Sequence, residues 1–314
     1  SQPERAEPHA DTLVSLVPGA GHLVHMPSHI YWRVGRYADA SKVNVMAASV
    51  DEAYIAACNA QGFYPAAYYP HNIHFLWASS SMEGRSAVAI EAARKVAANV
   101  RIEMIDQFPG VEFFNTIPLL ALTQFGLWDE VLAEAQPPEN LEYSNAVWHY
   151  VRATAFAQKG NVDAARAEYA SFTPLRDETD VVFLDSIYYP ATLLLTIADA
   201  LIQGEIATAE GRHDEAIGYY KIAVDTQDEL PYTEPPFWYY PTRHSLGKAM
   251  LAAGDPAGAE AVYREDLTNF PRNGWSLFGL VQAMEAQDKD ASEIQARFDL
   301  IWAQSDVTLT ASRF

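Results

Sequence analysis

The chain has 314 residues, 49% of them hydrophobic and 20% charged, and a formal net charge of −20. This composition excludes a disordered chain. The acidic balance excludes general nucleic-acid binding, because lysines and arginines must displace the counterions of nucleic acid and here they are few and scattered. No apolar run is long enough to span a bilayer, so we expect no membrane insertion.

The single cysteine, Cys58, lies in an alanine-rich stretch and is expected in the core. We expect a cytoplasmic protein, although so low a cysteine content also fits the periplasm.

The first predicted element is a helix over residues 3–17, which Pro18 ends. A second predicted helix begins at Gly21 and stops at a turn that reads Gly-Arg-Tyr-Ala-Asp-Ala (residues 35–40), after which a third helix begins. The turn pattern has a glycine, a bulky residue two positions later and a small residue five positions later. Helical periodicity on both sides predicts two antiparallel helices that lie closest together at the small residue.

The same turn recurs through the rest of the chain. Its further copies begin at Gly84, Gly126, Gly160, Gly211 and Gly254. Alternating segments of useful length are missing, so strands are not expected. The sequence therefore predicts an all-α solenoid of antiparallel helix pairs. Each pair buries its apolar face on its neighbours, which lets one array grow to this length as a single domain.

One unit, residues 240–271, shows the repeat most clearly. It has Leu246-Gly247 in its first helix, the Gly254 turn, and Ala259 in its second helix. This pattern resembles the tetratricopeptide family, whose unit has 34 residues. The resemblance implies about seven repeats in a right-handed superhelix with a concave groove.

The register divides the single solenoid into three parts. Residues 1–17 form a half repeat that consists of a second helix only, residues 21–110 form histidine-rich repeats, and residues 111–314 form further repeats and a C-terminal cap. We expect an N-terminal segment of the same protein to complete the array. The alternative is that residues 1–17 are a capping helix.

Five of the nine histidines lie in two short stretches. The first holds His22, His25 and His29, and the second holds His71 and His74. Spacings of three and four residues place such side chains on one helical face. In the tetratricopeptide register these are the second, fifth and ninth positions of adjacent first helices, which line the groove in that family. Adjacent first helices pack about 8–10 Å apart, so imidazoles from both can reach one point.

Converging imidazoles predict a transition-metal site for Cu, Zn or Fe. The predicted ligands are His25, His29, His71 and His74. His22 is an additional ligand or an outer partner. Two alternatives stay open: the histidines bind a peptide or carboxylate ligand, or they hold tyrosine hydroxyls and backbone carbonyls. Pro27 either bends the first helix or begins it after His25, and both arrangements put the histidines at an irregular helix start.

Other groove positions are weaker candidates. Trp32 and Arg33 continue the histidine face and, with Tyr68, would shape a pocket. Glu112 begins the next first helix, where a carboxylate would complete the metal site or act as a base; its alternative role is to interact with a helix dipole. In a distant repeat, the substrate-binding candidates are Arg243 and His244.

Two strings carry a narrower resemblance. His-Met-Pro-Ser-His-Ile (residues 25–30) and Tyr-Pro-His-Asn-Ile-His-Phe (residues 69–75) are similar to strings in a family of bacterial tetratricopeptide-repeat proteins. The resemblance implies an upstream histidine-rich helix, in agreement with the half repeat, but it supplies no reaction.

Two hypotheses for the function follow. In the first, the solenoid binds a transition metal in its groove and acts on a small molecule or peptide there, with the metal as Lewis acid or redox centre. In the second, the groove is a scaffold that binds a peptide or partner protein without catalysis. The sequence does not decide whether the protein is an enzyme, since it has no phosphate loop, serine-nucleophile motif or HExxH motif.

Overall fold

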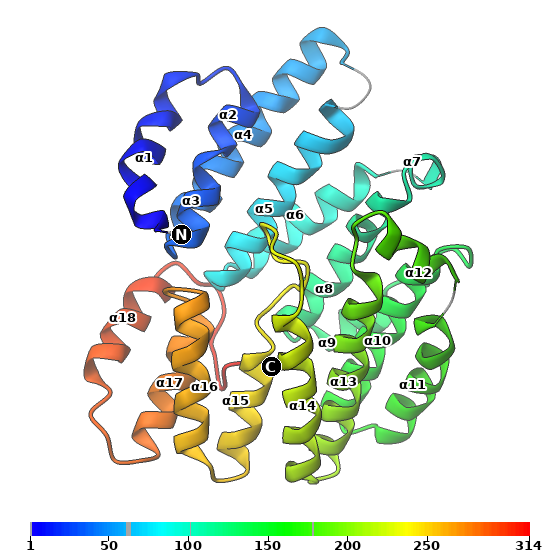
Figure 1. The fold of residues 1–314 in the computed structure, drawn as a ribbon, viewed down its shortest axis with the longest axis vertical. Helices are drawn as coiled ribbons and strands as arrows, with labels where there is room; N and C mark the ends of the chain where they lie inside the picture. Colours follow the sequence, from blue (N-terminus) through cyan, green and yellow to red (C-terminus); the bar gives the residue numbers. More distant parts are fainter. Residues whose placement is uncertain (1, 61–63, 101, 178) are drawn as a thin grey trace.

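The computed structural model describes residues 2–60, 64–100, 102–177 and 179–314, and all regular structure in these ranges is helical. Figure 1 shows the helices packed as antiparallel neighbours along one array. The prediction of an all-α, tetratricopeptide-like solenoid is confirmed. The short elements are η1 (Pro3–Ala6), the π-helical η2 (Tyr64–Tyr68) and η3 (Pro109–Thr116). The α-helices are α1 (Glu7–Leu16), α2 (Gly21–His25), α3 (Pro27–Arg33), α4 (Tyr37–Cys58), α5 (Tyr69–Met82), α6 (Ser86–Ala98), α7 (Ile102–Gln107), α8 (Ile117–Gln124), α9 (Trp128–Ala133), α10 (Glu142–Gln158), α11 (Val162–Arg176), α12 (Thr179–Ser186), α13 (Ala191–Ala209), α14 (His213–Asp228), α15 (Arg243–Ala252), α16 (Pro256–Asn269), α17 (Gly274–Glu285) and α18 (Ser292–Trp302).

The six predicted glycine turns join the helix pairs. Each of these glycines has a φ between 67° and 80°, a left-handed conformation in which glycine ends a helix without steric cost. The residue five positions after each glycine is fully buried, as the closest approach of two helices requires. These residues are Ala40, Ala89, Val131, Ala165, Ala216 and Ala259.

The array closes on itself. Figure 1 shows α17 and α18 beside the first helix pairs, with the C-terminus inside the molecule near α15. Trp275 on α17 donates a hydrogen bond of 2.9 Å to the carbonyl of Ser81 at the end of α5, and the Ser305 hydroxyl donates one of 2.9 Å to the carbonyl of Gly84. At the far end, Arg313 donates to the carbonyl of Gln124 at 3.0 Å. The last part of the chain therefore holds together the turns of two early pairs, at Gly84 and Gly126.

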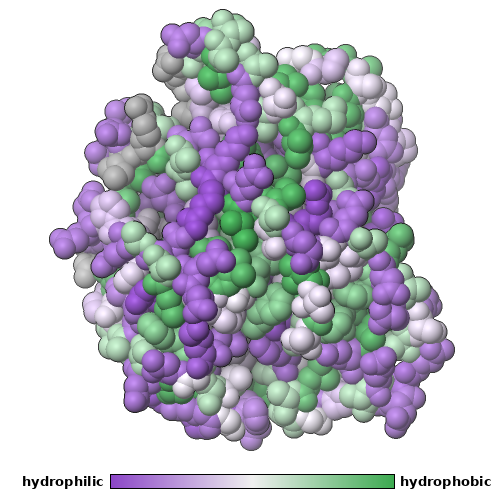
Figure 2. Space-filling model, turned by 180° about the vertical axis from the view of Figure 1, so that it is seen from behind, coloured by the Kyte–Doolittle hydropathy of each residue, from purple (hydrophilic) through white to green (hydrophobic). Residues whose placement is uncertain are grey.

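α13 is the one described helix that is long and apolar enough to cross a membrane. Of the 18-residue stretch that makes it apolar enough, 67% is buried inside the protein. It packs against α10, α11 and α14, which makes it a core helix of the array. Figure 2 shows the molecule from behind, where the rim is mostly hydrophilic and hydrophobic residues gather near the middle of the face.

At the start of the chain, α1 packs against α2 and α3, as a second helix of a preceding pair would. Leu16 and Val17 at its end are 64% and 43% exposed. The interpretation of residues 1–17 as a half repeat stays a prediction. Cys58, expected in the core, is instead exposed, because it is the last residue of α4, beyond the part of that helix that neighbouring helices cover.

One long connection positions the site. Residues 229–242 link α14 to α15 without regular structure, and Figure 1 shows this segment reaching across the molecule toward α5. Connections longer than about 12 residues are uncommon in compact domains, and many carry function. We call residues 230–241 the α14–α15 loop.

Candidate functional site

Three histidines from two adjacent helix pairs meet in the interior of the array. His25 is the last residue of α2, His29 lies in the first turn of α3, and His71 lies in the first turn of α5. One ring nitrogen from each lies within 4.8 Å of the other two. Pro27 is the first residue of α3, and Met26 between α2 and α3 keeps helical dihedral angles, so His25 and His29, four residues apart, face the same side. We call His25, His29 and His71 the histidine cluster.

The position of the ring proton on His25 follows from its neighbour Asn44. The amide nitrogen of Asn44 donates to the carbonyl of Ala40 at 2.8 Å, which fixes the orientation of the amide. Its oxygen therefore faces Nδ1 of His25, at 2.7 Å. Because that oxygen can only accept, Nδ1 of His25 carries the proton and Nε2 keeps its lone pair.

The ring of His29 is fixed in the same way from the opposite side. Its Nδ1 lies 2.6 Å from Oε2 of Glu234, which comes from the α14–α15 loop. A carboxylate accepts, so Nδ1 of His29 is the donor, and in the neutral form of the ring Nε2 is then the acceptor. Glu234 also accepts from the hydroxyl of Tyr232, and the guanidinium of Arg33 lies 3.7 Å away.

The Nε2 nitrogens of the two rings point at each other. Nε2 of His25 and Nε2 of His29 are 3.0 Å apart. Two neutral imidazoles in these tautomers repel at this distance unless a cation or a shared proton lies between them. Metal-bound histidines are usually held in this way, with the far nitrogen donating to a carboxylate or carbonyl oxygen. The arrangement can therefore bind a transition-metal ion.

An aromatic ring supports the histidine cluster. The ring of Phe75, which is fully buried, lies 4.8–5.5 Å from the ring centres of all three histidines. Burial is the main cause that lowers the pKa of His25 to about 2 and the pKa of His71 to about 4, and the neighbouring imidazoles add to it. Both rings are therefore neutral at physiological pH, the form in which histidine binds a metal.

The structure does not bring the other two predicted histidines into the cluster. His74 stacks on Trp77 of the same helix at 5.1 Å and faces the next repeat, where it meets Phe113 and Phe114 edge-on. Burial lowers its pKa to about 3. His22 lies 5.8 Å from His25, ring centre to ring centre, and packs on Tyr68 at 4.4 Å. Tyr68 therefore flanks the cluster through His22.

Glu112 interacts with a different helix. Its carboxylate accepts from the backbone NH and the hydroxyl of Ser144, at 2.9 and 2.8 Å, in the first turn of α10. This is the role at a helix N-terminus that the sequence left as the alternative. Glu112 is therefore occupied away from the histidine cluster.

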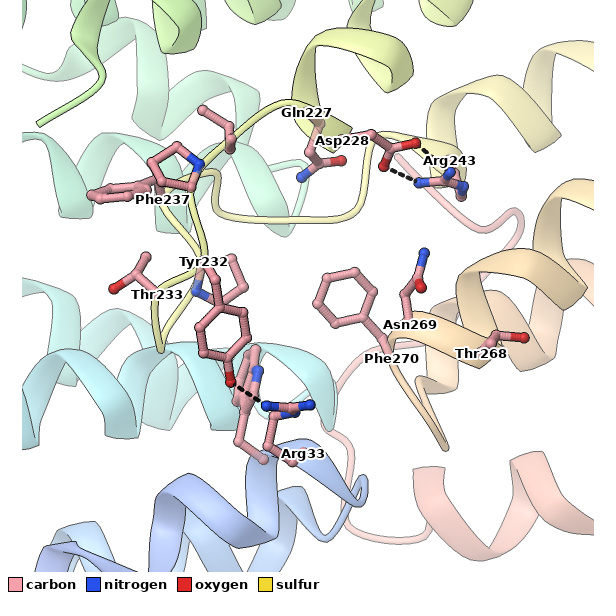
Figure 3. A pocket seen from close by; sticks show the side chains of 14 residues that line it. Arg33, Gln227, Asp228, Tyr232, Thr233, Phe237, Arg243, Thr268, Asn269 and Phe270 are labelled. Carbon is pink, nitrogen blue, oxygen red and sulfur yellow. Dashed lines mark hydrogen bonds and ion pairs between the residues drawn. The ribbon is translucent and has the colours of Figure 1, made fainter. Parts of the chain in front are cut away.

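The four remaining candidates divide between a cavity and the core. Trp32, Arg33 and Arg243 line a cavity of about 420 Å³ that opens beside the α14–α15 loop, and Figure 3 shows Arg33 bonded to Tyr232 and Arg243 to Asp228. Arg243 makes two hydrogen bonds to Asp228, at 2.8 and 2.7 Å, and another of 2.7 Å to Glu265, so its charge is already balanced. His244, predicted in the groove, is fully buried instead. Its Nε2 accepts from Asn273 at 2.7 Å, because its helix turns that side toward α17.

Sequence reasoning missed Glu234 and Asn44. Both lie outside the histidine motifs, and Glu234 is 205 positions from its partner. One signal for Glu234 was available: the α14–α15 loop is too long for a turn between repeats and carries four prolines around its one carboxylate. Nothing in the sequence singles out Asn44 within α4.

The comparison with family models agrees with the fold. Residues 241–265 match the family described as Tetratricopeptide repeat, which falls on α15 and most of α16. Among solved structures, the chain is similar to one titled "Crystal structure of APC/C hetero-tetramer Cut9-Hcn1", with 13% identity and a TM-score of 0.34 over 96% of this chain. The chain spans 57% of the length of that structure. No curated protein matches the sequence. Helical-repeat arrays of this kind commonly bind peptides or proteins on their concave surface.

Proposed function

We propose that the protein binds one transition-metal ion through His25, His29 and His71. The observation that carries the proposal is the 3.0 Å approach of the Nε2 atoms of His25 and His29, whose Nδ1 atoms donate to Asn44 and Glu234. In a tetrahedral site with metal–nitrogen bonds of about 2.0–2.1 Å, two ligand nitrogens lie about 3.3 Å apart. An ion bound there replaces the repulsion of the two lone pairs with two bonds.

The number of ligands supports a reactive site. Three protein nitrogens leave a coordination position open, which is typical of catalytic metal sites, whereas structural sites have four protein ligands. Imidazole ligands suit Zn, Cu or Fe, and such an ion supplies Lewis-acid or redox chemistry when it is bound. His25 and His71 hold the ion from two helix pairs, and Glu234 orients His29. The proposal is therefore a metal-dependent activity on a small molecule bound beside the cluster.

Metal analysis of the purified protein tests this proposal. We expect about one Zn, Cu or Fe ion per chain after loading and desalting, and below about a tenth of that in His29→Ala, because removal of one of three ligands weakens binding strongly. His149→Ala is the matched control: His149 pairs with Glu168 at 2.7 Å on another helix pair, so its removal should leave the metal content unchanged. Equal metal content in wild type and His29→Ala would refute the proposal.

A second candidate is a peptide-binding scaffold, favoured by the 420 Å³ cavity of Figure 3, which combines Arg33, Tyr232 and Phe270 on a concave surface. Selection from a random peptide library tests it. Peptides that bind the wild type should lose binding to Arg33→Ala/Phe270→Ala and keep it to His29→Ala. If no peptide is enriched, the groove is not a peptide site.

A further inference from the structure

A second, smaller cavity lies directly beside the histidine cluster. Its volume is about 120 Å³, and it lies between α5, η3, α8 and the α14–α15 loop. His71 and Glu234 line it, and both also belong to the site described above. The loop separates it from the larger cavity of Figure 3, since Thr233, Pro236 and Phe237 line both. We call it the aromatic pocket.

The walls of this pocket are a connected set of rings. His74 stacks on Trp77 and meets Phe113 at 5.6 Å. Phe113 in turn stacks on Tyr189 at 5.1 Å with an interplanar angle of 17°, and Tyr189 meets Phe237 edge-on. Offset-stacked and edge-to-face contacts are the geometries that aromatic rings prefer. A ring that enters the pocket would extend this set in the same geometry.

Polar groups are few in the pocket. The hydroxyl of Tyr189 is already bonded to that of Tyr143 at 2.8 Å. Among the described lining residues, Glu234 carries the one carboxylate, and its oxygens bind His29 and Tyr232. The imidazoles of His71 and His74 and the indole NH of Trp77, a buried donor without a partner in the described structure, are among the polar groups left to meet a ligand. Such a lining selects a mainly apolar molecule with few hydrogen-bonding groups, because a polar group that met only the aromatic rings would be desolvated without a partner.

The volume sets the size of the ligand. An apolar cavity of about 150 Å³ is known to hold a benzene ring. A pocket of about 120 Å³ is slightly smaller than that cavity, so it encloses at most a single ring.

We propose that the aromatic pocket binds an uncharged, single-ring aromatic molecule of the phenol class, with its hydroxyl directed toward His71 and His74. The inference deepens the proposed function, because it names the class of molecule that would meet the bound ion. It rests on the proposed function only in assuming that an ion is bound beside the pocket. The shape and lining of the pocket are independent of whether an ion binds.

Ligand-observed NMR titration tests the inference on metal-free and Zn²⁺-loaded protein, with p-cresol as the probe. We expect saturable binding of one p-cresol per chain with a Kd below about 1 mM. Cyclohexanol and 2-naphthol should bind at least about tenfold more weakly, since one cannot stack and the other overfills the pocket. Absence of saturable p-cresol binding, or equal binding of the three probes, would overturn the inference.

A pocket-filling variant locates the binding site. Leu120 lines the aromatic pocket, so Leu120→Trp should weaken p-cresol binding by at least about tenfold. Leu193 lines a separate surface groove, and Leu193→Trp should keep the Kd within about twofold. Unchanged p-cresol binding by Leu120→Trp would also overturn the inference. If circular dichroism shows that this variant is unfolded, the comparison of the three probes on the wild type decides whether the inference stands.

The metal measurements separate the two proposals. Protein that binds p-cresol with this selectivity and binds no metal supports the aromatic pocket and refutes the metal site. Protein that binds metal without binding p-cresol leaves the metal site standing and refutes the aromatic pocket.

Discussion

Nδ1 of His29 and Oε2 of Glu234 lie 2.6 Å apart although 205 residues separate them in the sequence. This contact connects the first helix pair to the loop between α14 and α15, on the opposite side of the array. It fixes the tautomer of His29 and places a negative charge behind the imidazole. A carboxylate in this position raises the basicity of a metal-binding imidazole.

Removal of this carboxylate should weaken metal binding without abolishing it. We expect Glu234→Ala to lower the affinity about 10–100-fold, the usual effect of losing an outer partner of a ligating histidine. Glu234→Gln should fall between this variant and wild type, because the amide oxygen still accepts from Nδ1 but carries no charge. Competition with a chromophoric chelator measures the affinity. Glu229→Ala, an exposed carboxylate at the end of α14, is the control. An affinity of Glu234→Ala equal to that of the control would contradict the assigned role.

The pH dependence of stability follows from the buried histidines. Burial lowers the pKa of His74 to about 3, below its ordinary value of 6.5, so the unfolded chain binds this proton more readily than the folded protein does. The folded state is therefore favoured fully above about pH 6.5 and loses free energy as the pH falls toward 3. Between pH 7.5 and pH 5, His74 alone should account for a loss of about 2 kcal/mol.

Urea unfolding of metal-free protein at pH 7.5 and pH 5 measures this loss. The variant His74→Phe replaces the imidazole with a ring that does not titrate, and its stability should fall by about 2 kcal/mol less than that of wild type over the same interval. His149→Phe, at a position only partly buried, is the comparison. The same decrease in wild type and His74→Phe would show that His74 is not held neutral by the fold.

Much of the fold could be predicted because the repeat is a local pattern. Each glycine turn and the small residue five positions later lie within six residues of one another, so the pattern is readable without any long-range contact. The register also brought His25, His29 and His71 to adjacent first helices. The register did not distinguish His71 from His74, since both lie on the same face of α5. Which of them meets His25 depends on the angle at which α5 crosses the neighbouring helix pairs.

Two features were beyond the reach of a repeat pattern. The closure of the array depends on residues such as Trp275 and Arg313, which contact helix pairs about 190 residues away. Glu234 reaches His29 only because this closure brings the second half of the chain over the first. Periodicity assigned Arg243 and His244 to the groove; Arg243 lines the larger cavity in a balanced ion pair with Asp228, whereas His244 turns into the core.

A matched pair of glycines tests the closure. Gly35 and Gly160 have nearly the same φ, 74° and 73°. A Cβ added to Gly35 would lie 1.9 Å from the carbonyl oxygen of Pro271, whereas a Cβ added to Gly160 would meet no atom within 4 Å. Gly160→Ala should cost about 1–2 kcal/mol, the strain of a left-handed alanine. Gly35→Ala should cost a further 1–3 kcal/mol, about the usual effect of overpacking. Urea unfolding gives both values. Equal losses in the two variants would mean that the contact with Pro271 does not form in solution.

The penultimate residue, Arg313, should be a large single contributor to stability. Its side chain is 2% exposed, donates to the carbonyl of Gln124 and to the hydroxyl of Tyr239, both at 3.0 Å, and lies over the ring of Tyr240. Arg313→Ala leaves the carbonyl of Gln124 without this donor, removes one of two partners of the Tyr239 hydroxyl and opens a cavity, so we expect a loss of about 3 kcal/mol.

The matched control for Arg313 is Arg297→Ala, an exposed arginine on α18 whose loss should stay within about 0.5 kcal/mol. Since Arg313 connects α8 to the base of the α14–α15 loop, its removal should also loosen Glu234 and lower metal affinity, by a smaller factor than Glu234→Ala does. Urea unfolding and chelator competition on the same preparations measure both effects. A stable Arg313→Ala protein, equal to the control in its unfolding midpoint, would show that the C-terminal segment is not part of the cooperative core.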